Sequence, residues 1–192
     1  MSDSPGHPPA HPPLADASVR TGRPNDTPAI GAVQAETFAA AYALILPSQA
    51  LDQFHPDAFA RAWREALTTP PSTAHRVLVA CAGDQVVGFA AIGPSADTDG
   101  AAPGSAGELS VLCVHPAARR AGHGSRLLNA SADTLTAAGF QAMSGWVLAD
   151  DDSTRAFATA AGLSPDGAWR DRIVGPDGET VREVRLVAHL GS

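Results

Sequence analysis

The chain has 192 residues, of which 44% are hydrophobic, and its formal net charge at pH 7 is −7. This length is enough for one domain with a real core, and no apolar run is long enough to span a bilayer. The negative charge disfavours nucleic acid or an anionic membrane as the main partner, because both attract basic surfaces.

The two cysteines, Cys81 and Cys113, lie inside apolar segments that we predict to be strands. Buried free thiols in a reducing compartment are the simpler interpretation of that placement. The first residues lack a basic segment followed by an apolar one, so we see no secretory signal. These features predict a cytoplasmic protein.

Residues 1–16 are rich in proline and nearly free of large apolar side chains. Such a segment buries too little surface to offset the entropy that ordering costs, so we expect a disordered tail. A single domain over residues 17–192 follows it.

Hydrophobic periodicity and turn residues predict the remaining elements. They are a strand near 18–23, a helix from 25 to about 46, a loop or short helix at 48–54, a helix from 55, strands at 75–82, 85–92 and 108–114, a helix at 122–138, a strand at 141–149, a helix from about 150 to 161, and strands at 168–174 and 181–189. A loop that we expect to be mobile covers 93–107. This order, β-α-α-β-β-β-α-β-α-β-β, describes an α/β sandwich around a mixed sheet.

The segment Glu108–Leu128 is the most informative, because an apolar strand leads through a Gly-rich turn into an amphipathic helix. The first N–H groups of a helix have no internal partners, and the helix dipole favours an anion there. Gly122 and Gly124 would let a phosphate approach the backbone. The alternative is that these glycines only allow tight packing. A dinucleotide-binding motif fits less well, since Leu127 stands where its third glycine would be.

Two segments carry a resemblance to a known family. Arg119-Arg120-Ala121-Gly122-His123-Gly124 follows the pattern Gln/Arg-x-x-Gly-x-Gly/Ala, and Phe157–Leu163 is similar to a Phe-Tyr-x-x-x-Gly-Phe pattern on a later helix. With the element order, they make residues 18–190 resemble the GNAT superfamily of acyl-CoA-dependent N-acetyltransferases. The resemblance implies a mixed, mostly antiparallel sheet flanked by helices.

The resemblance also implies a binding site for acetyl-CoA as co-substrate and no metal. Main-chain groups of Cys113 and Val114 would meet the pantetheine arm, and Asp151 falls where the family often has an asparagine beside it. The residues implied for the pyrophosphate, mainly through their N–H groups, are Arg119, Arg120, Ala121, Gly122, His123, Gly124 and Ser125. We expect the His123 side chain to be exposed.

For the chemistry, the resemblance makes Glu108 the general base, the alternative being an exposed residue at a strand entrance. The family's usual acid, a tyrosine after the phenylalanine of the second pattern, is replaced by Ala158. Tyr42, Phe54 and Trp146 are candidates for the acceptor pocket, although large aromatic residues are more often core.

These observations predict an enzyme that transfers acetyl from acetyl-CoA to the primary amine of a small molecule or peptide by direct attack in a ternary complex. A covalent acetyl-cysteine has no support in the sequence. The competing prediction is a catalytically degenerate acyl-CoA-binding sensor or interaction module. No nucleic acid or membrane partner is expected, and a homodimer is an arrangement that the resemblance leaves open.

Overall fold

The computed structural model describes residues 17–46, 48–97, 105–174 and 178–191. The tail predicted over 1–16 lies outside the described residues, as does the middle of the predicted loop, 98–104. None of the helices in the described ranges is long and apolar enough to cross a membrane.

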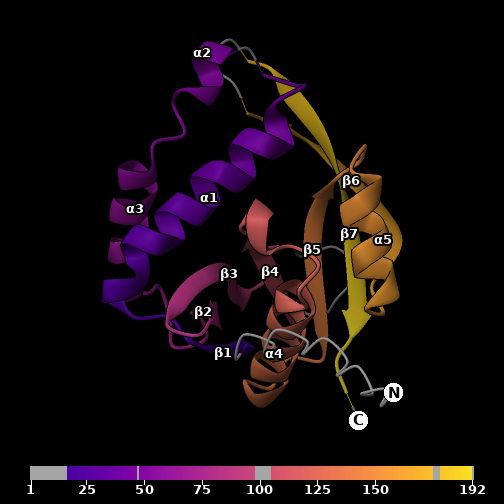
Figure 1. The fold of residues 1–192 in the computed structure, drawn as a ribbon. Helices are drawn as coiled ribbons and strands as arrows, with labels where there is room; N and C mark the ends of the chain where they lie inside the picture. The colour runs from indigo at the N-terminus through magenta and orange to yellow at the C-terminus, as the bar shows by residue number, and fades with distance from the viewer. Residues whose placement is uncertain (1–16, 47, 98–104, 175–177, 192) are drawn as a thin grey trace, which may run out of the picture.

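Seven strands form one sheet in the order β1-β2-β3-β4-β5-β7-β6 (Figure 1). They are β1 (Ala17–Thr21), β2 (Arg76–Ala82), β3 (Gln85–Pro94), β4 (Ala106–Val114), β5 (Ala142–Leu148), β6 (Ser164–Ile173) and β7 (Thr180–His189). Neighbouring strands are antiparallel except β4 and β5, which run parallel. The sheet is therefore mixed and mostly antiparallel, which confirms the predicted fold class.

The strands β4 and β5 separate along their length. They pair only where residues 106–109 face residues 142–145. Beyond that point β4 continues along β3 as far as Val114, and β5 continues along β7 as far as Leu148. Beyond the paired residues the two diverging edges have no strand partner on their facing sides in the described chain, so another extended chain could pair with them.

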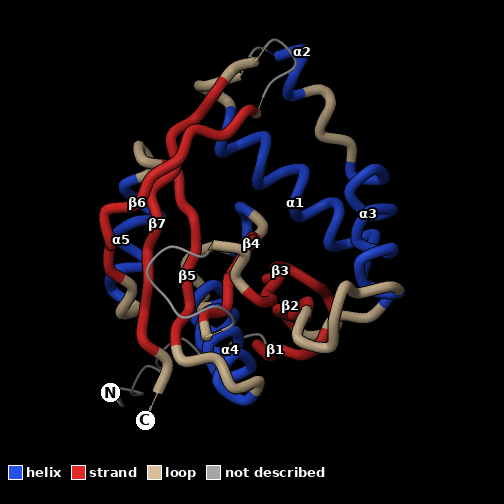
Figure 2. Tube along the Cα trace, turned by 180° about the vertical axis from the view of Figure 1, so that it is seen from behind, coloured by secondary structure: helices blue, strands red, loops and turns tan. Residues whose placement is uncertain are grey.

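Helices cover both faces of the sheet (Figure 2). They are α1 (Thr27–Tyr42), α2 (Ser48–Leu51), α3 (Pro56–Thr68), α4 (His123–Ala137) and α5 (Asp152–Ala160), with 3-10 turns at Pro24–Asp26 and Pro116–Ala118. One core cluster joins α1 and α3 to the sheet, and another joins α4 and α5 to the opposite face. We call these the α1/α3 face and the α4/α5 face.

The α1/α3 face is held by Ile30, Val33 and Phe89, each at most 2% exposed, with Trp63 packed edge-on against Phe89. The two helices approach closely at Gly31, where a Cβ would collide with the α3 backbone. The α4/α5 face is built by side chains that recur at helical spacing and meet strand residues. Its buried members are Ile92, Leu128, Leu135, Phe140, Met143, Ala158, Leu163 and Leu186.

The predicted element order is confirmed, and several boundaries differ. Strands β3 and β4 each extend two residues into the predicted loop, to Pro94 and from Ala106. The first helix ends at Tyr42 and not near Leu46, because the proline at position 47 disfavours helical geometry in the residue before it. The short helix α2 falls within the segment left as loop or helix. Strand β6 begins at Ser164, earlier than predicted, because an irregularity between Pro165 and Trp169 lets an edge strand accept residues typical of a loop.

Candidate active site

The turn before α4 has the geometry of an anion site. Gly122 caps the helix with a φ of 81°, and Arg120 also has a positive φ, 62°. The amide of Arg126 is the first to donate within the helix, to Gly122 O at 3.1 Å. Within the described chain, the amides of residues 120–125 have no carbonyl acceptor, so their donors remain for a ligand.

Two of the arginines at this turn donate to main-chain carbonyls, and of these two only Arg119 was predicted from the sequence. Arg119 Nε donates to Val114 O at 3.4 Å. Arg126, which was not predicted, folds back, so that its Nη1 donates to Ala121 O at 3.2 Å and lies 2.6 Å from where a Cβ on Gly122 would be. Sequence spacing could have indicated this contact of Arg126, because a residue four positions after Gly122 returns to the same side of the helix.

His123 is a correction to the sequence prediction. Its side chain is 4% exposed and not solvated, and its Nδ1 has no hydrogen-bond partner in the described chain. It stands four residues before Leu127, so it continues the buried stripe of α4 back to the first helical position. Burial, and secondarily the charge of Arg126, lowers the pKa of this imidazole.

Cys113 faces the protein interior and not the turn. It is 2% exposed, and burial raises the pKa of its thiol to about 12 despite a hydrogen bond with Thr37. The carbonyl of the next residue, Val114, accepts from Thr37 Oγ1 at 3.5 Å and from Arg119. A thiol in these surroundings is almost entirely protonated near neutral pH.

Glu108 lies where β4 and β5 are still paired, with Gly93 on one side and Ser144 on the other. Its side chain is partly buried on the α1/α3 face and has no ion pair or hydrogen bond to any described residue. Burial raises its pKa, the charge of Asp97 adds to the rise, and Arg170 opposes it. Both observations suit a group that must accept a proton near neutral pH.

A charged group that was not predicted from the sequence lies on the same face. Arg170 and Arg172 of β6, here called the arginine pair, both reach one carboxylate, Glu183 of β7. Arg170 Nε donates to Glu183 Oε2 at 2.7 Å, and Arg172 Nε is 2.8 Å from Oε1. Glu183 is 5% exposed. Alternation along two paired strands brings these side chains together, which the separate segments do not reveal.

Two of the three aromatic candidates for the acceptor pocket, Trp146 and Tyr42, contact the arginine pair. Trp146 lies under Arg170, whose Cζ is 4.2 Å from the ring centroid, and its Nε1 donates to Asp97 at 3.0 Å. The buried Tyr42 hydroxyl accepts from Arg172 Nη2. Phe54 instead packs in an aromatic cluster, with its ring centroid 6.1 Å from that of Tyr42.

The two residues at which the second family-like segment departs from the family pattern, Asp151 and Ala158, both have structural roles. Asp151 caps α5, its carboxylate accepting from Thr154 N at 2.9 Å and Thr154 Oγ1 at 2.6 Å. Ala158 is 6% exposed in the core beneath α5. Phe157 approaches Gly124, with 3.4 Å from its ring to where a Cβ would be, so the N-terminus of α4 contacts α5.

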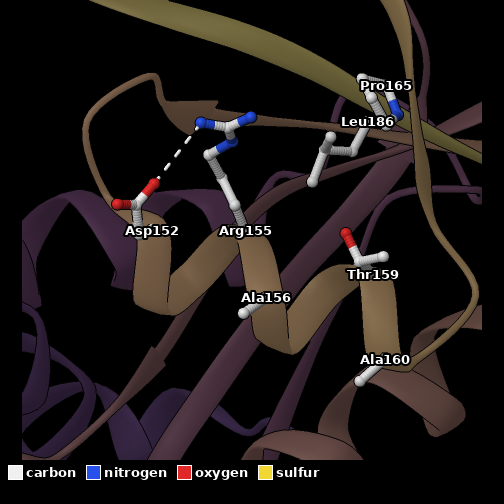
Figure 3. Close-up of a pocket in the computed structure, with 7 residues that line it drawn as sticks. All are labelled: Asp152, Arg155, Ala156, Thr159, Ala160, Pro165 and Leu186. Atoms are coloured by element: carbon white, nitrogen blue, oxygen red, sulfur yellow. Dashed lines mark ion pairs between the residues drawn. The ribbon is translucent and has the colours of Figure 1, made fainter.

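A groove of about 530 Å³ lies elsewhere, between α5 and the start of β6 (Figure 3). Arg155 and Asp152 face one another at its edge, 3.6 Å apart. Its lining includes none of the predicted site residues. Among the described residues no group of three His, Cys, Asp or Glu side chains could hold a metal ion.

Solved structures share this fold at low sequence identity. The PaiA N-acetyltransferase of Thermoplasma acidophilum, solved with coenzyme A, has a TM-score of 0.70 and 15% identity, covering 91% of this chain and 99% of its own. The yncA structure from Salmonella typhimurium with acetyl-CoA has 0.66 and 20%, covering 92% and 95%. The ribosomal-protein-S18-alanine N-acetyltransferase of Escherichia coli has 0.64 and 16%, again covering 92% and 95%.

Sequence comparison is decisive at the level of the family. No curated protein matches the chain. The sequence profile of the acetyltransferase (GNAT) family matches residues 38–163, which span from α1 to the end of the second family-like segment. The chain therefore belongs to the GNAT acetyltransferase family.

Proposed function

We propose that this protein transfers an acetyl group from acetyl-CoA to a primary amine by direct attack in a ternary complex. The observation that carries the proposal is Glu108, a partly buried carboxylate without a described partner and with a raised pKa, on the strand that leads to the anion-binding turn. The two buried free cysteines support a reducing, cytoplasmic setting.

The residues around the turn fit a coenzyme A pyrophosphate. Free amides over residues 120–125 supply donors, and the positive φ of Gly122 keeps that backbone approachable. Arg119 and Arg126 add positive charge. The diverging edges of β4 and β5 suit the extended, amide-bearing pantetheine arm. When bound, acetyl-CoA supplies a thioester whose carbonyl an amine can attack.

Glu108 would take the proton that the acceptor ammonium must lose, directly or through water. The reaction forms a carbon–nitrogen bond, breaks the carbon–sulfur bond, and leaves a thiolate. The attacking nitrogen loses its second proton to solvent, and the thiolate takes up a proton from solvent. A base is most effective when its pKa is near the working pH, and burial moves Glu108 in that direction. Because the carboxylate is the active form, activity should fall as pH drops through this raised pKa.

A binding module without turnover is the second candidate, and one observation favours it. The position where relatives carry a tyrosine acid holds Ala158, whose methyl group is buried in the core. The nearby Asp151 is occupied as a helix cap. Acetyl-CoA binding without amine-dependent turnover would fit this alternative.

Release of coenzyme A in the presence of a panel of amines separates the two candidates. Turnover requires a base, so Glu108→Gln should lower kcat by roughly 10²- to 10⁴-fold while leaving the Kd for acetyl-CoA unchanged. The matched control is Glu65→Gln, an exposed carboxylate on α3, which should leave both quantities unchanged. Acetyl-CoA binding with no amine-dependent release would refute the enzyme and support the sensor.

A further inference from the structure

The arginine pair is the feature that the proposed acetyl transfer leaves unused. Arg170 and Arg172 alternate on β6, so both project from the face that carries Glu108 and Trp146. Their side chains are 43% and 41% exposed, although the carboxylate that joins them is nearly buried. Solvent, and therefore a ligand, reaches the guanidinium groups from outside.

The bonds within this cluster hold the guanidinium groups but do not saturate them. Arg170 Nε donates to Glu183, Arg172 Nε forms an ion-pair contact with the same carboxylate but no hydrogen bond in the described chain, and Arg172 Nη2 donates to Tyr42. In the described chain, the terminal nitrogens of Arg170 and the Nη1 of Arg172 have no protein partner. Two cations share one carboxylate, which leaves one net positive charge. This arrangement matches a singly charged, planar anion such as a carboxylate.

The neighbouring acids bond to a third arginine and not to the arginine pair. Arg185 lies deeper, 8% exposed, and engages Asp166 at 2.8 Å and Asp97 at 3.4 Å. Because one cation there faces two acids, the match to an anion rests on the unoccupied guanidinium nitrogens of the arginine pair and not on the summed charge of the region. Trp146 supports the Arg170 guanidinium from beneath, which fixes its plane before a ligand arrives.

Strand β5 places Glu108 and Arg170 on one stretch of the same face. Glu108 lies opposite Ser144, and Trp146, two residues further along β5, lies under Arg170 with 4.2 Å from the Cζ to the ring centroid. No ion pair joins Glu108 to Arg170 among the described residues. A molecule with its amine at Glu108 and an anionic group at Arg170 would bridge the two side chains.

We infer that the acceptor is an amino-carboxylate, an amine with a carboxylate a few bonds away, whose carboxylate is bound by Arg170 and Arg172. This inference rests on the proposed acetyl transfer and narrows its substrate class. The arginine pair positions the acceptor, whereas Glu108 takes the proton.

Matched substrates test the inference. L-amino acids are compared with their carboxamides and with the corresponding decarboxylated amines, using coenzyme A release as the readout. We expect amino acids to have a kcat/KM roughly 10- to 100-fold higher, mainly through KM, because a charged hydrogen-bond pair is lost in the analogues. Equal or better turnover of the uncharged analogues would overturn the inference and leave the proposed function intact.

Two variants assign the preference to the arginine pair. Arg170→Gln and Arg172→Gln should each reduce the preference for amino acids over their uncharged analogues roughly tenfold or more, and this reduction should appear in KM. Arg170→Lys keeps the charge but loses the planar fork, so it should retain part of the preference. The matched control is Arg182→Gln, because Arg182 likewise stacks on a tryptophan, Trp169, and pairs with an acid, Asp171, but on the opposite face. A preference that survives in the Gln variants would overturn the assignment.

A binding measurement distinguishes failure of the inference from failure of the function. Glu108→Gln loaded with coenzyme A is titrated calorimetrically with an amino acid and with its carboxamide. Carboxylate-dependent binding in this variant, with no turnover of any amine by the natural protein, would support the anion site and refute the acetyltransferase. Equal binding of the amino acid and its carboxamide would refute the anion site.

Discussion

Glu108 acquires its properties from burial and from three charged neighbours. Its carboxylate is partly removed from water, Asp97 and Glu183 disfavour its ionisation, and Arg170 favours it. The net result is a raised pKa, which means that the folded protein holds this proton more tightly than the unfolded chain does. The raised pKa that suits Glu108 to the proposed role therefore also lowers the stability of the folded protein at neutral pH.

The effect of Glu108 on the free energy of unfolding can be measured with the variant Glu108→Gln. Below the ordinary pKa range of glutamate, both folded and unfolded chains carry the neutral acid, and the variant and natural protein should be equally stable. As pH rises through the raised pKa, the natural protein ionises a partly buried group and should become the less stable of the two. Urea unfolding at acid and neutral pH tests this, with Glu65→Gln as control. A stability difference that does not change with pH would contradict it.

Cys113 should be dispensable for the chemistry. With 2% exposure and a pKa of about 12, its thiol is neither accessible nor ionised near neutrality. Cys113→Ala is expected to retain turnover, at a cost of about 1 kcal/mol in the free energy of unfolding. Steady-state coenzyme A release measures the first quantity and denaturant unfolding the second. Loss of turnover with intact coenzyme A binding would instead indicate a covalent route.

At the scale of elements, the turn into α4 has a left-handed backbone conformation at Gly122. An L-residue in the left-handed region costs roughly 1–2 kcal/mol, so Gly122→Ala should lower the free energy of unfolding by that amount. Its methyl group would also displace Arg126 Nη1, which lies 2.6 Å from that position. Coenzyme A affinity should fall roughly tenfold, measured by calorimetry.

The matched control for this variant is Gly139→Ala. Gly139 ends α4 with a φ of 91°, and a methyl group placed on its Cα would have no atom within 4 Å. The same backbone cost applies there without any contact at the anion site. Equal loss of coenzyme A affinity in both variants would show that the effect comes from global destabilisation and not from the turn.

Local signals in the sequence determine which parts of this structure are predictable. The positions of proline and glycine and the apolar periodicity were enough to predict the element order. A Gly-rich turn motif was the basis for predicting a binding role for residues 119–125, which stays a prediction. The arginine pair was not predictable, because its meaning arises only when β6 and β7 pair in register and bring Glu183 between the two guanidinium groups. His123 was misjudged because the turn was considered without the helical stripe that it begins.

At the scale of the whole molecule, the sheet is divided where β4 and β5 separate, a boundary that we call the seam. Strands on one side of it pack with α1 and α3, and the C-terminal strands β5, β7 and β6 lie on the other side (Figure 1). Only residues 106–109 and 142–145 pair across the seam. A ligand that contacts both edges should therefore stabilise the whole fold and not one element alone.

Coenzyme A at a concentration of 100 times its Kd should stabilise the folded state by about 2.7 kcal/mol. Thermal unfolding with and without coenzyme A measures this as a rise in Tm, and Gly122→Ala should show a smaller rise at the same concentration. An unchanged Tm for the natural protein at saturating coenzyme A would contradict binding to the folded state.

The central claim is that the amine-facing carboxylate and the anion-binding turn together form an acetyltransferase. It is tested most directly by the pH dependence of amine acetylation, following coenzyme A release and the acetylated amine together. We predict that kcat/KM rises with pH through a pKa above the ordinary value for glutamate, and that Glu108→Gln lowers the rate and abolishes this limb. Acetyl-CoA binding without any acetylated amine, or an unchanged pH profile in Glu108→Gln, would contradict the claim.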